Sequence, residues 1–364
     1  NLLKNLKCTT TYAVDRNLST TKTYLSPNLG SSGYTNGGSV TNVSSLRNNW
    51  NFTNSLSYDQ VFAEKHALTL LAGYDIQKYD NDSWNAPQNN ASDPFFKNFQ
   101  GNWTTLSGAG GSVTERFYRS TFVRATYNYN KRYFLTANFR RDGNSALGAN
   151  SKYGDFGGVS LGWSIFEEDF YKNSSLANLL GDLRFRGSWG KVGNGNLSAY
   201  ESLNLYSSSL YGTAPTWSMS QAGDPDLGWE TSEQTNLGLS LDLAQKRLHV
   251  DVDYFRNNVN GLILDVPQSP SKGIPGYSIL KNVGSMYNRG IEFAISGDIV
   301  KKRDFTWNAS LNFTHVKNKV TALSDGNADI IGYTHTTTEA NNITRVGYAV
   351  GCLYGAVTDG VNPE

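Results

Sequence analysis

Long apolar runs are missing from this sequence. No stretch approaches the roughly 18 consecutive apolar residues of a membrane-spanning helix, and only 38% of the 364 residues are hydrophobic. Neither sign of charge dominates either, because the formal net charge is +1. A protein that mainly binds nucleic acid carries a basic excess. The composition therefore disfavours both a helical membrane protein and a nucleic-acid-binding protein.

Cysteine is also scarce. Cys8 and Cys352 lie far apart, and two distant cysteines make neither a disulfide framework nor a metal site. We interpret both as structural residues, in preference to a bond between them. The histidines are isolated and show no metal-binding spacing; they are His66, His249, His315 and His335. We therefore expect no metal and no cofactor.

Aromatic residues and glycine are abundant by contrast, with 13% aromatic residues and 36 Gly. Residues 119–130 place Val123 and Tyr127 on one face of a strand and Arg124 on the other, and residues 132–140 repeat the pattern. Successive strand residues point to opposite faces, so this is a hairpin with one apolar face. Its arms approach the roughly 9–11 residues of a tilted transmembrane strand, and tyrosines beside its turn are typical of an aromatic girdle. A soluble sandwich hairpin stays open at this point.

The rest of the chain repeats the alternation. Further strands are predicted near residues 6–14, 17–24 (after a turn at Asp15 and Arg16), 46–58, 68–76, 159–165, 183–189, 237–243, 248–254, 291–295, 305–313 and 346–357. A short helix is predicted within residues 167–180.

Connection length decides between the all-β architectures. Short turns alternate strictly with long loops, such as residues 79–113 and 193–229. A sandwich mixes loop lengths, and a propeller repeats every 40–50 residues or so. The alternation predicts an all-β fold, an antiparallel up-and-down transmembrane β-barrel in an outer membrane, whose apolar face meets lipid. We assign residues 1–364 to this one barrel domain and expect them to be part of a longer polypeptide.

Several stretches resemble the SusC/RagA family of TonB-dependent outer-membrane transporters from Bacteroidetes. They are RRDGNS (140–145), KYGDF (152–156), VSLGW (159–163), LRFRGSWGKVGN (183–194), DPDLGWE (224–230), NVGSMYNRGIE (282–292) and VGYAVGCLYG (346–355). The sequence departs from the family where Gly157 and Gly158 replace a usual Pro-Ser, and where Asp224 and Gly228 replace a common Asn and Lys.

The resemblance implies a barrel of about 22 strands with a plugged lumen. It implies a plug domain and TonB box before Asn1, and final strands after Glu364. It also implies a SusD-like lipoprotein partner, energy supplied through TonB, and uptake of oligosaccharides or, less often, peptides. A passive porin and a structural barrel on the same scaffold are the alternatives.

Aromatic residues on the long loops are the candidate contacts with substrate or with the lipoprotein lid. They are Trp84, Phe95, Phe96, Trp103, Tyr211, Trp217 and Tyr277. A sugar ring stacks on aromatic faces, and loops on a rigid scaffold often bind ligands. An enzyme is disfavoured: Gly158 to Gly162 match G-x-S-x-G, but the strand pattern continues past Ser160, where a nucleophile elbow needs a sharp turn.

Overall fold

An antiparallel sheet of 12 strands forms the body of the protein. The computed structural model describes residues 5–28, 30, 35, 37–93, 95, 97–100, 103–106, 108–243, 247–333, 340–355 and 360. The strands of this sheet are β1 (Leu6–Leu25), β2 (Ser39–Phe62), β3 (His66–Ala91), β4 (Trp103–Leu106), β5 (Gly110–Tyr129), β6 (Tyr133–Asn144), β7 (Tyr153–Ser164), β8 (Leu183–Asn194), β11 (Glu230–Leu243), β12 (Leu248–Pro267), β13 (Ser278–Lys301) and β14 (Thr306–Ala322).

Each strand of the sheet lies beside the next strand of the sheet along the chain, apart from β4, which pairs only with β3. Between β8 and β11 the chain forms β9 and β10, which make a separate two-stranded sheet. Consecutive pairing is the up-and-down topology that the sequence predicts, and the all-β antiparallel fold class is confirmed.

The chain divides into two compact units. Unit 1 comprises Asn1–Cys8, Ser55–Gly73 and Thr121–Glu364, and unit 2 comprises Thr9–Asn54 and Tyr74–Ser120. In unit 2, the buried carboxylate of Asp75 accepts hydrogen bonds from Thr53 (2.6 Å) and Gln77 (2.8 Å). Buried polar groups need such partners, so Asp75 fixes β2 against β3 in this unit.

Short turns join the strands at one end of unit 1. Between β5 and β6, Asn130 and Lys131 both have positive φ, and Arg132 N–H donates to the Tyr129 carbonyl at 2.9 Å. Two residues with positive φ make the turn whose twist matches that of the strands, and Asn tolerates this conformation best among non-glycine residues. The backbone N–H of Asn130 also reaches the Lys65 carbonyl in the turn between β2 and β3, at 2.7 Å.

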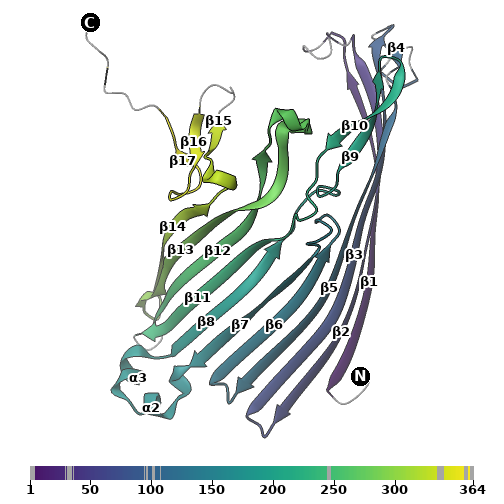
Figure 1. Ribbon diagram of the computed structural model, residues 1–364. Helices are drawn as coiled ribbons and strands as arrows, with labels where there is room; N and C mark the ends of the chain where they lie inside the picture. The colour runs from purple at the N-terminus through teal and green to yellow at the C-terminus, as the bar shows by residue number, and fades with distance from the viewer. Residues whose placement is uncertain are drawn as a thin grey trace. The chain divides into compact units, whose positions relative to one another are not determined.

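The connection from β7 to β8 at the same end is helical. It contains η1 (Ile165–Glu167), α2 (Asp169–Lys172) and α3 (Ser175–Leu180), which confirms the predicted short helix (Figure 1). Among the described residues, no helix is long and apolar enough to cross a bilayer.

Long connections lie at the opposite end of unit 1 (Figure 1). One carries the hairpin of β9 (Leu205–Tyr211) and β10 (Ala214–Gln221), and another carries η2 (Pro270–Lys272) and η3 (Pro275–Tyr277). Past β14 come η4 (Asp325–Asn327) and a small sheet of β15 (Ile330–Tyr333), β16 (Ala340–Thr344) and β17 (Cys352–Leu353).

The two faces of the sheet follow the predicted alternation. On β11 and β12, Leu239 pairs with Val252 on the apolar face, while Ser240 pairs with Asp251 on the polar face. Large apolar side chains such as Leu161 (56% exposed) and Leu311 (61% exposed) have most of their surface uncovered on the apolar face. A sheet that exposes an apolar band in this way needs an apolar environment around it.

The strand prediction differs from the structure at two places. Residues 6–25 form the single strand β1, so the predicted turn at Asp15 and Arg16 is wrong. Neither residue has a positive φ, which a two-residue hairpin turn requires. Of the strand predicted near residues 346–357, residues 356 and 357 lie outside the described residues. Its described part contains only the strand Cys352–Leu353, because turns and a bend at residues 346–351, with positive φ at Gly347 and Gly351, interrupt it.

Candidate functional site

A small buried cluster ties together the long connections of unit 1. Its members are Ala146, Leu147, Leu197 and Leu227, and we call it the loop-base cluster. Leu147 is fully buried and Leu227 is 1% exposed. Trp229, Ile263 and Leu280 pack against it. Since these residues come from the connections after β6 and β8, from the segment before β11, and from β12 and β13, the cluster joins successive long connections into one base.

Hydrogen bonds reinforce the loop-base cluster. The buried Asn144 amide donates to the Gly195 carbonyl at 2.8 Å, and the Gly148 N–H donates to the Leu227 carbonyl at 2.7 Å. The Asn282 side chain accepts from Gly228 N–H at 2.6 Å and donates back to the Gly228 carbonyl at 3.1 Å. Side-chain amides thus replace the ladder bonds that the backbone loses where strands end.

The residues of this base lie in or next to the stretches that carry the family resemblance. Asn144 belongs to RRDGNS, Leu227 and Trp229 belong to DPDLGWE, and Asn282 opens NVGSMYNRGIE. The shared motifs therefore build the support for the long connections.

The β9–β10 hairpin lies in the connection between Leu197 and Leu227 of the loop-base cluster and presents aromatic side chains. Gln221 at the end of β10 donates to the carbonyls of Tyr200 (2.9 Å) and Leu203 (3.0 Å), which fixes the root of the hairpin. Tyr211 is 85% exposed and Trp217 is 76% exposed. The hairpin also contacts η3, which carries the exposed Tyr277. Three of the predicted contact residues therefore lie on neighbouring elements of unit 1.

The other predicted contact residues belong to unit 2. Trp84 and Phe95 are exposed. Trp103 is only 9% exposed: its indole N–H donates to the Asn98 carbonyl at 3.0 Å and its ring packs on Tyr24. Trp103 thus helps to pack its own loop. Phe96 lies outside the described residues. The substrate or lid role of all seven aromatic residues stays a prediction.

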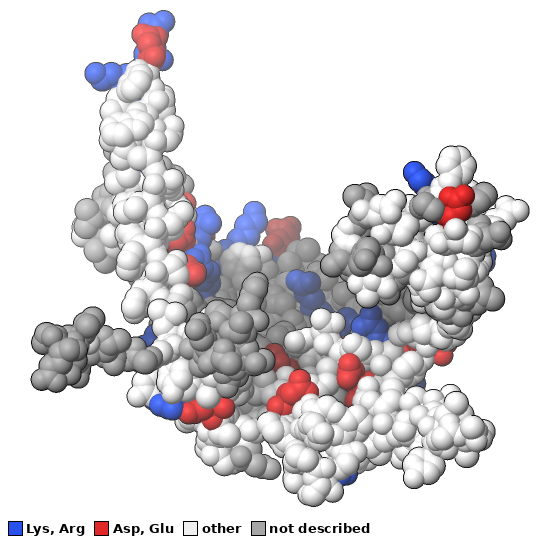
Figure 2. Space-filling view, turned by 90° about the horizontal axis from the view of Figure 1, so that it is seen from above, with Lys and Arg blue, Asp and Glu red and all other residues white. Residues whose placement is uncertain are grey.

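A charged network occupies the polar face near the short-turn end. It consists of Arg186 on β8, Ser240 and Asp242 on β11, and His249, Asp251 and Asp253 on β12, and we call it the Arg186 network. Figure 2 shows both acidic and basic side chains on the surface of the molecule.

Arg186 makes the central contacts of this network. Its Nε and Nη2 donate to both carboxylate oxygens of Asp253, at 3.2 and 2.7 Å, and Nη2 also reaches Asp251 at 3.2 Å. Its Nη1 lies 2.5 Å from the Ser240 hydroxyl. The His249 ring nitrogens lie 2.7 Å from Asp242 and 2.8 Å from Asp251. Bidentate geometry of this kind makes the strongest charge-assisted hydrogen bonds.

Glycine at position 238 makes room for this pairing. A Cβ added to Gly238 would collide with the Asp253 carboxylate and the Arg186 side chain. On the apolar face of the neighbouring strand, a Cβ added to Gly187 would meet Leu237 at an ordinary 3.5 Å. Sequence analysis did not single out the Arg186 network; the available signal was charge at alternate positions, at Arg184 and Arg186 and at Asp251 and Asp253.

Glu168 anchors the helical connection at the short-turn end. Its carboxylate accepts hydrogen bonds from the Trp163 indole at 3.0 Å and from Arg132 at 3.2 Å. Hydrogen bonds from Tyr133 and Trp163, with the nearby Arg132 charge, hold the pKa of the Glu168 carboxyl below its ordinary value. The ionised carboxylate therefore stabilises the contact of this connection with β6 and β7.

The G-x-S-x-G stretch does not form the sharp turn of a nucleophile elbow. Ser160 lies inside β7, paired with Thr136 on β6 and Ser188 on β8, so the strand runs straight through the G-x-S-x-G stretch. Within the described part of the chain, no group of His, Cys, Asp or Glu could hold a metal ion.

A face-alternating antiparallel sheet with short turns at one end and anchored long connections at the other defines an outer-membrane β-barrel protein. The family described as TonB dependent receptor-like, beta-barrel matches residues 3–353, and the chain belongs to this family. It is part of an outer-membrane barrel, and the family consists of transport receptors, not of enzymes.

Individual relatives agree with this assignment. A TonB-dependent receptor of Formosa agariphila is 34% identical over 317 residues, which are 85% of this chain and 29% of that protein. The TonB-dependent receptor SusC of Bacteroides thetaiotaomicron is 32% identical over 250 residues, which are 65% of this chain and 24% of that protein. The chain thus spans less than a third of the length of these relatives.

Among solved structures, the RagAB peptide transporter superposes with a TM-score of 0.81 at 28% identity. The match covers 96% of this chain and 38% of the transporter chain. The predicted resemblance to the SusC/RagA family is confirmed.

Proposed function

We propose that the protein is a SusC-like, TonB-dependent importer of oligosaccharides that works with a SusD-like surface lipoprotein. The observation that carries this proposal is the β9–β10 hairpin, which lies along the chain between Leu197 and Leu227 of the loop-base cluster and presents Tyr211 and Trp217 to solvent. Short turns of such barrels face the periplasm and long loops face outward. The hairpin would therefore meet substrate or lipoprotein outside the cell.

Oligosaccharides suit this combination of surfaces. Exposed aromatic rings offer flat faces to the C–H side of a sugar ring, and the polar face beyond them carries amides and hydroxyls, such as Asn236 and Ser188, that can bind sugar hydroxyls. Energy would come from TonB through a plug domain, as the family resemblance implies, because nothing in these strands supplies a driving force for uphill transport.

Peptides are the second candidate substrate. The similarity to the RagAB peptide transporter favours them, and so do the charges of both signs on the polar face, where Arg186 lies beside Asp251 and Asp253. A peptide backbone with charged ends could exchange partners with such groups, whereas a neutral glycan would depend on stacking and hydroxyl contacts.

The test is ligand binding to the full-length protein purified from outer membranes with any chains that accompany it. Calorimetric titration with a panel of oligosaccharides is compared with titration by a mixed tryptic-peptide pool. We expect Trp217→Ala to weaken oligosaccharide binding about 5- to 30-fold, which corresponds to about 1–2 kcal/mol for one stacked aromatic side chain. Trp307→Ala is the matched control, because Trp307 is 53% exposed on the apolar face of β14.

Equal oligosaccharide binding by the wild type and Trp217→Ala would show that Trp217 on the hairpin does not contact the substrate. Binding of the peptide pool alone, with no oligosaccharide bound, would replace the glycan proposal by the peptide one.

A further inference from the structure

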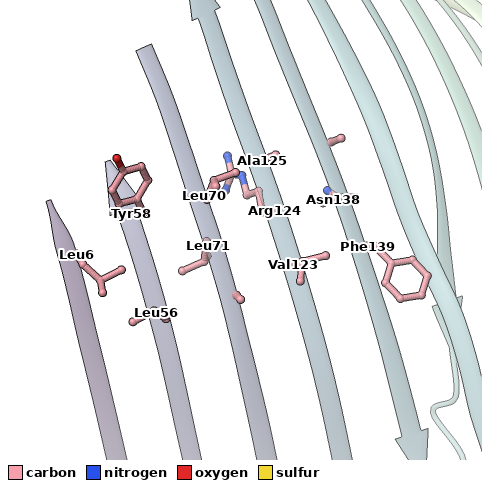
Figure 3. A pocket seen from close by; sticks show the side chains of 12 residues that line it. Leu6, Leu56, Tyr58, Leu70, Leu71, Val123, Arg124, Ala125, Asn138 and Phe139 are labelled. Atoms are coloured by element: carbon pink, nitrogen blue, oxygen red, sulfur yellow. The ribbon is translucent and has the colours of Figure 1, made fainter. Parts of the chain in front are cut away.

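A hollow of about 510 Å³ interrupts the apolar face of unit 1 (Figure 3). It crosses β1, β2, β3, β5 and β6, and apolar side chains form nearly all of its wall. The residues that line it from the apolar face include Leu56, Ala72, Val123, Ala125, Ala137 and Phe139. Its volume lies in the range of about 300–1,000 Å³ that is typical of ligand pockets.

Small side chains create this hollow. Ala72, Ala125 and Ala137 lie on neighbouring strands, between larger residues that include Leu56 and Phe139. Elsewhere on the apolar face, large side chains such as Leu161 and Trp189 stand at the surface. Alanine leaves the backbone of the sheet as the floor of a groove, and the larger neighbours form its walls.

An aromatic row fixes the depth of the hollow in the membrane. Tyr129 and Tyr133 stack with ring centroids 6.2 Å apart, and Tyr133 stacks on Trp163 at 6.3 Å. His66 continues the row, 4.8 Å from Tyr129, and Phe170 follows Trp163 at 6.5 Å. Aromatic residues collect where lipid headgroups begin, so this row marks the interface at the short-turn, periplasmic end.

The hollow lies inside the hydrocarbon region of that leaflet. Ala125 and Ala137 are four residues from Tyr129 and Tyr133 along their strands, and Val123 and Phe139 are six residues away. At about 3.3 Å per residue and a strand tilt of about 35–45°, this separation places the hollow about 10–15 Å below the interface. Because the strands are tilted, a straight groove along the membrane normal crosses several neighbouring strands, as the hollow does.

We propose that the hollow binds one acyl chain of an anionic phospholipid of the periplasmic leaflet. A flexible hydrocarbon chain fits a groove whose wall is almost entirely apolar, and the aromatic row positions the headgroup above it. The exposed Lys65 and Lys131 lie on the two adjacent turns that the Asn130–Lys65 backbone hydrogen bond joins, where a phosphate would sit. A second barrel is a poorer occupant, because a stable protein interface needs about 1,200–2,000 Å² of complementary surface.

Native mass spectrometry of the full-length protein, extracted in mild detergent, tests the proposal. We expect the wild type to retain one phospholipid per chain, with phosphatidylglycerol retained over phosphatidylethanolamine when both are offered. Ala125→Leu and Ala137→Leu fill the groove from the apolar face. Each should lower retention about tenfold, because the acyl chain loses many individually weak dispersion contacts.

Ala309→Leu is the control, since Ala309 is exposed on the apolar face of β14, outside the hollow. Heat-dependent migration on a denaturing gel confirms that each variant is folded. Lys65→Gln combined with Lys131→Gln should remove the preference for phosphatidylglycerol and leave one lipid bound.

Equal retention by the wild type, Ala125→Leu and Ala137→Leu would overturn the proposal. A wild-type dimer that Ala125→Leu dissociates, with no lipid retained by either, would also overturn it and would assign the hollow to a second copy of the protein.

Discussion

Replacing Leu147 by alanine tests whether the loop-base cluster holds the long connections in place. Leu147 is fully buried and packs with Ala146, Leu197 and Leu227. Truncation of a buried leucine costs the transfer free energy of the lost methyl groups plus the cost of the remaining cavity, about 2–4 kcal/mol at a well-packed site.

The cost should appear as local opening, not as unfolding of the sheet. The cluster lies where strands end, and a protein opens first where few contacts hold a segment. The N–H of Gly148 donates to the Leu227 carbonyl across the cluster at 2.7 Å, so its hydrogen exchange reports this opening. A loss of about 2–4 kcal/mol corresponds to exchange about 30- to 1,000-fold faster.

Hydrogen exchange read by mass spectrometry on the detergent-solubilised protein makes the measurement. Peptides that contain Gly148 should lose protection in Leu147→Ala, while peptides from the middle of β11 should keep theirs. Leu311→Ala is the matched control, because Leu311 is 61% exposed on the apolar face and should leave Gly148 unchanged. Unchanged exchange at Gly148 in Leu147→Ala would refute the role of the cluster, and a uniform loss across all strands would refute its local character.

Two further predictions concern the short-turn end. Gly238→Ala should lower the free energy of unfolding in urea by about 1–3 kcal/mol, because its Cβ collides with the Arg186 pairing, whereas Gly187→Ala should be neutral; equal stability of both variants would contradict this. Because the pKa of Glu168 is lowered in the folded protein, its ionised carboxylate contributes to folding stability above the ordinary carboxyl pKa. This contribution is lost as the pH falls through the lowered pKa. The thermal stability lost in Glu168→Gln at pH 7 should therefore vanish on acidification, with Glu167→Gln as control; a difference that persists at pH 2 would contradict this.

Local pattern was enough to predict the body of the fold. Apolar and polar residues alternate along residues 237–243 and 248–254, and this alternation decides which side chains share a face. In the structure, Leu237 pairs with Tyr254 and Leu243 pairs with Leu248. A shift of one residue would turn the polar side chains toward lipid, so the pattern specifies the register strongly. Short turns add to this, because Asn130 accepts the positive φ that the hairpin needs.

Local pattern failed where distant contacts decide the structure. The β9–β10 hairpin lies within residues 193–229, which were predicted as a loop, because its serine-rich strands carry little apolar alternation. The loop-base cluster joins residues separated by up to 81 positions, from Ala146 to Leu227. No periodicity reports such contacts; only the family resemblance pointed to the stretches that make them.

The contact role of the seven aromatic residues stays a prediction. Exposure of Trp84, Tyr211, Trp217 and Tyr277 agrees with a contact role, but amino-acid type alone did not separate them from the buried Trp103. The one-domain assignment of residues 1–364, the total of about 22 strands and the plug domain with its TonB box stay predictions.

Uptake by living cells tests the central claim most directly. Cells that carry the intact gene, an in-frame deletion or the restored gene would be given a fluorescently labelled oligosaccharide pool, with and without an uncoupler of the proton-motive force. A TonB-dependent importer predicts uptake that is lost on deletion, restored by the gene and abolished by the uncoupler. Gene-dependent uptake that continues in the uncoupler's presence would contradict the account and identify a passive porin.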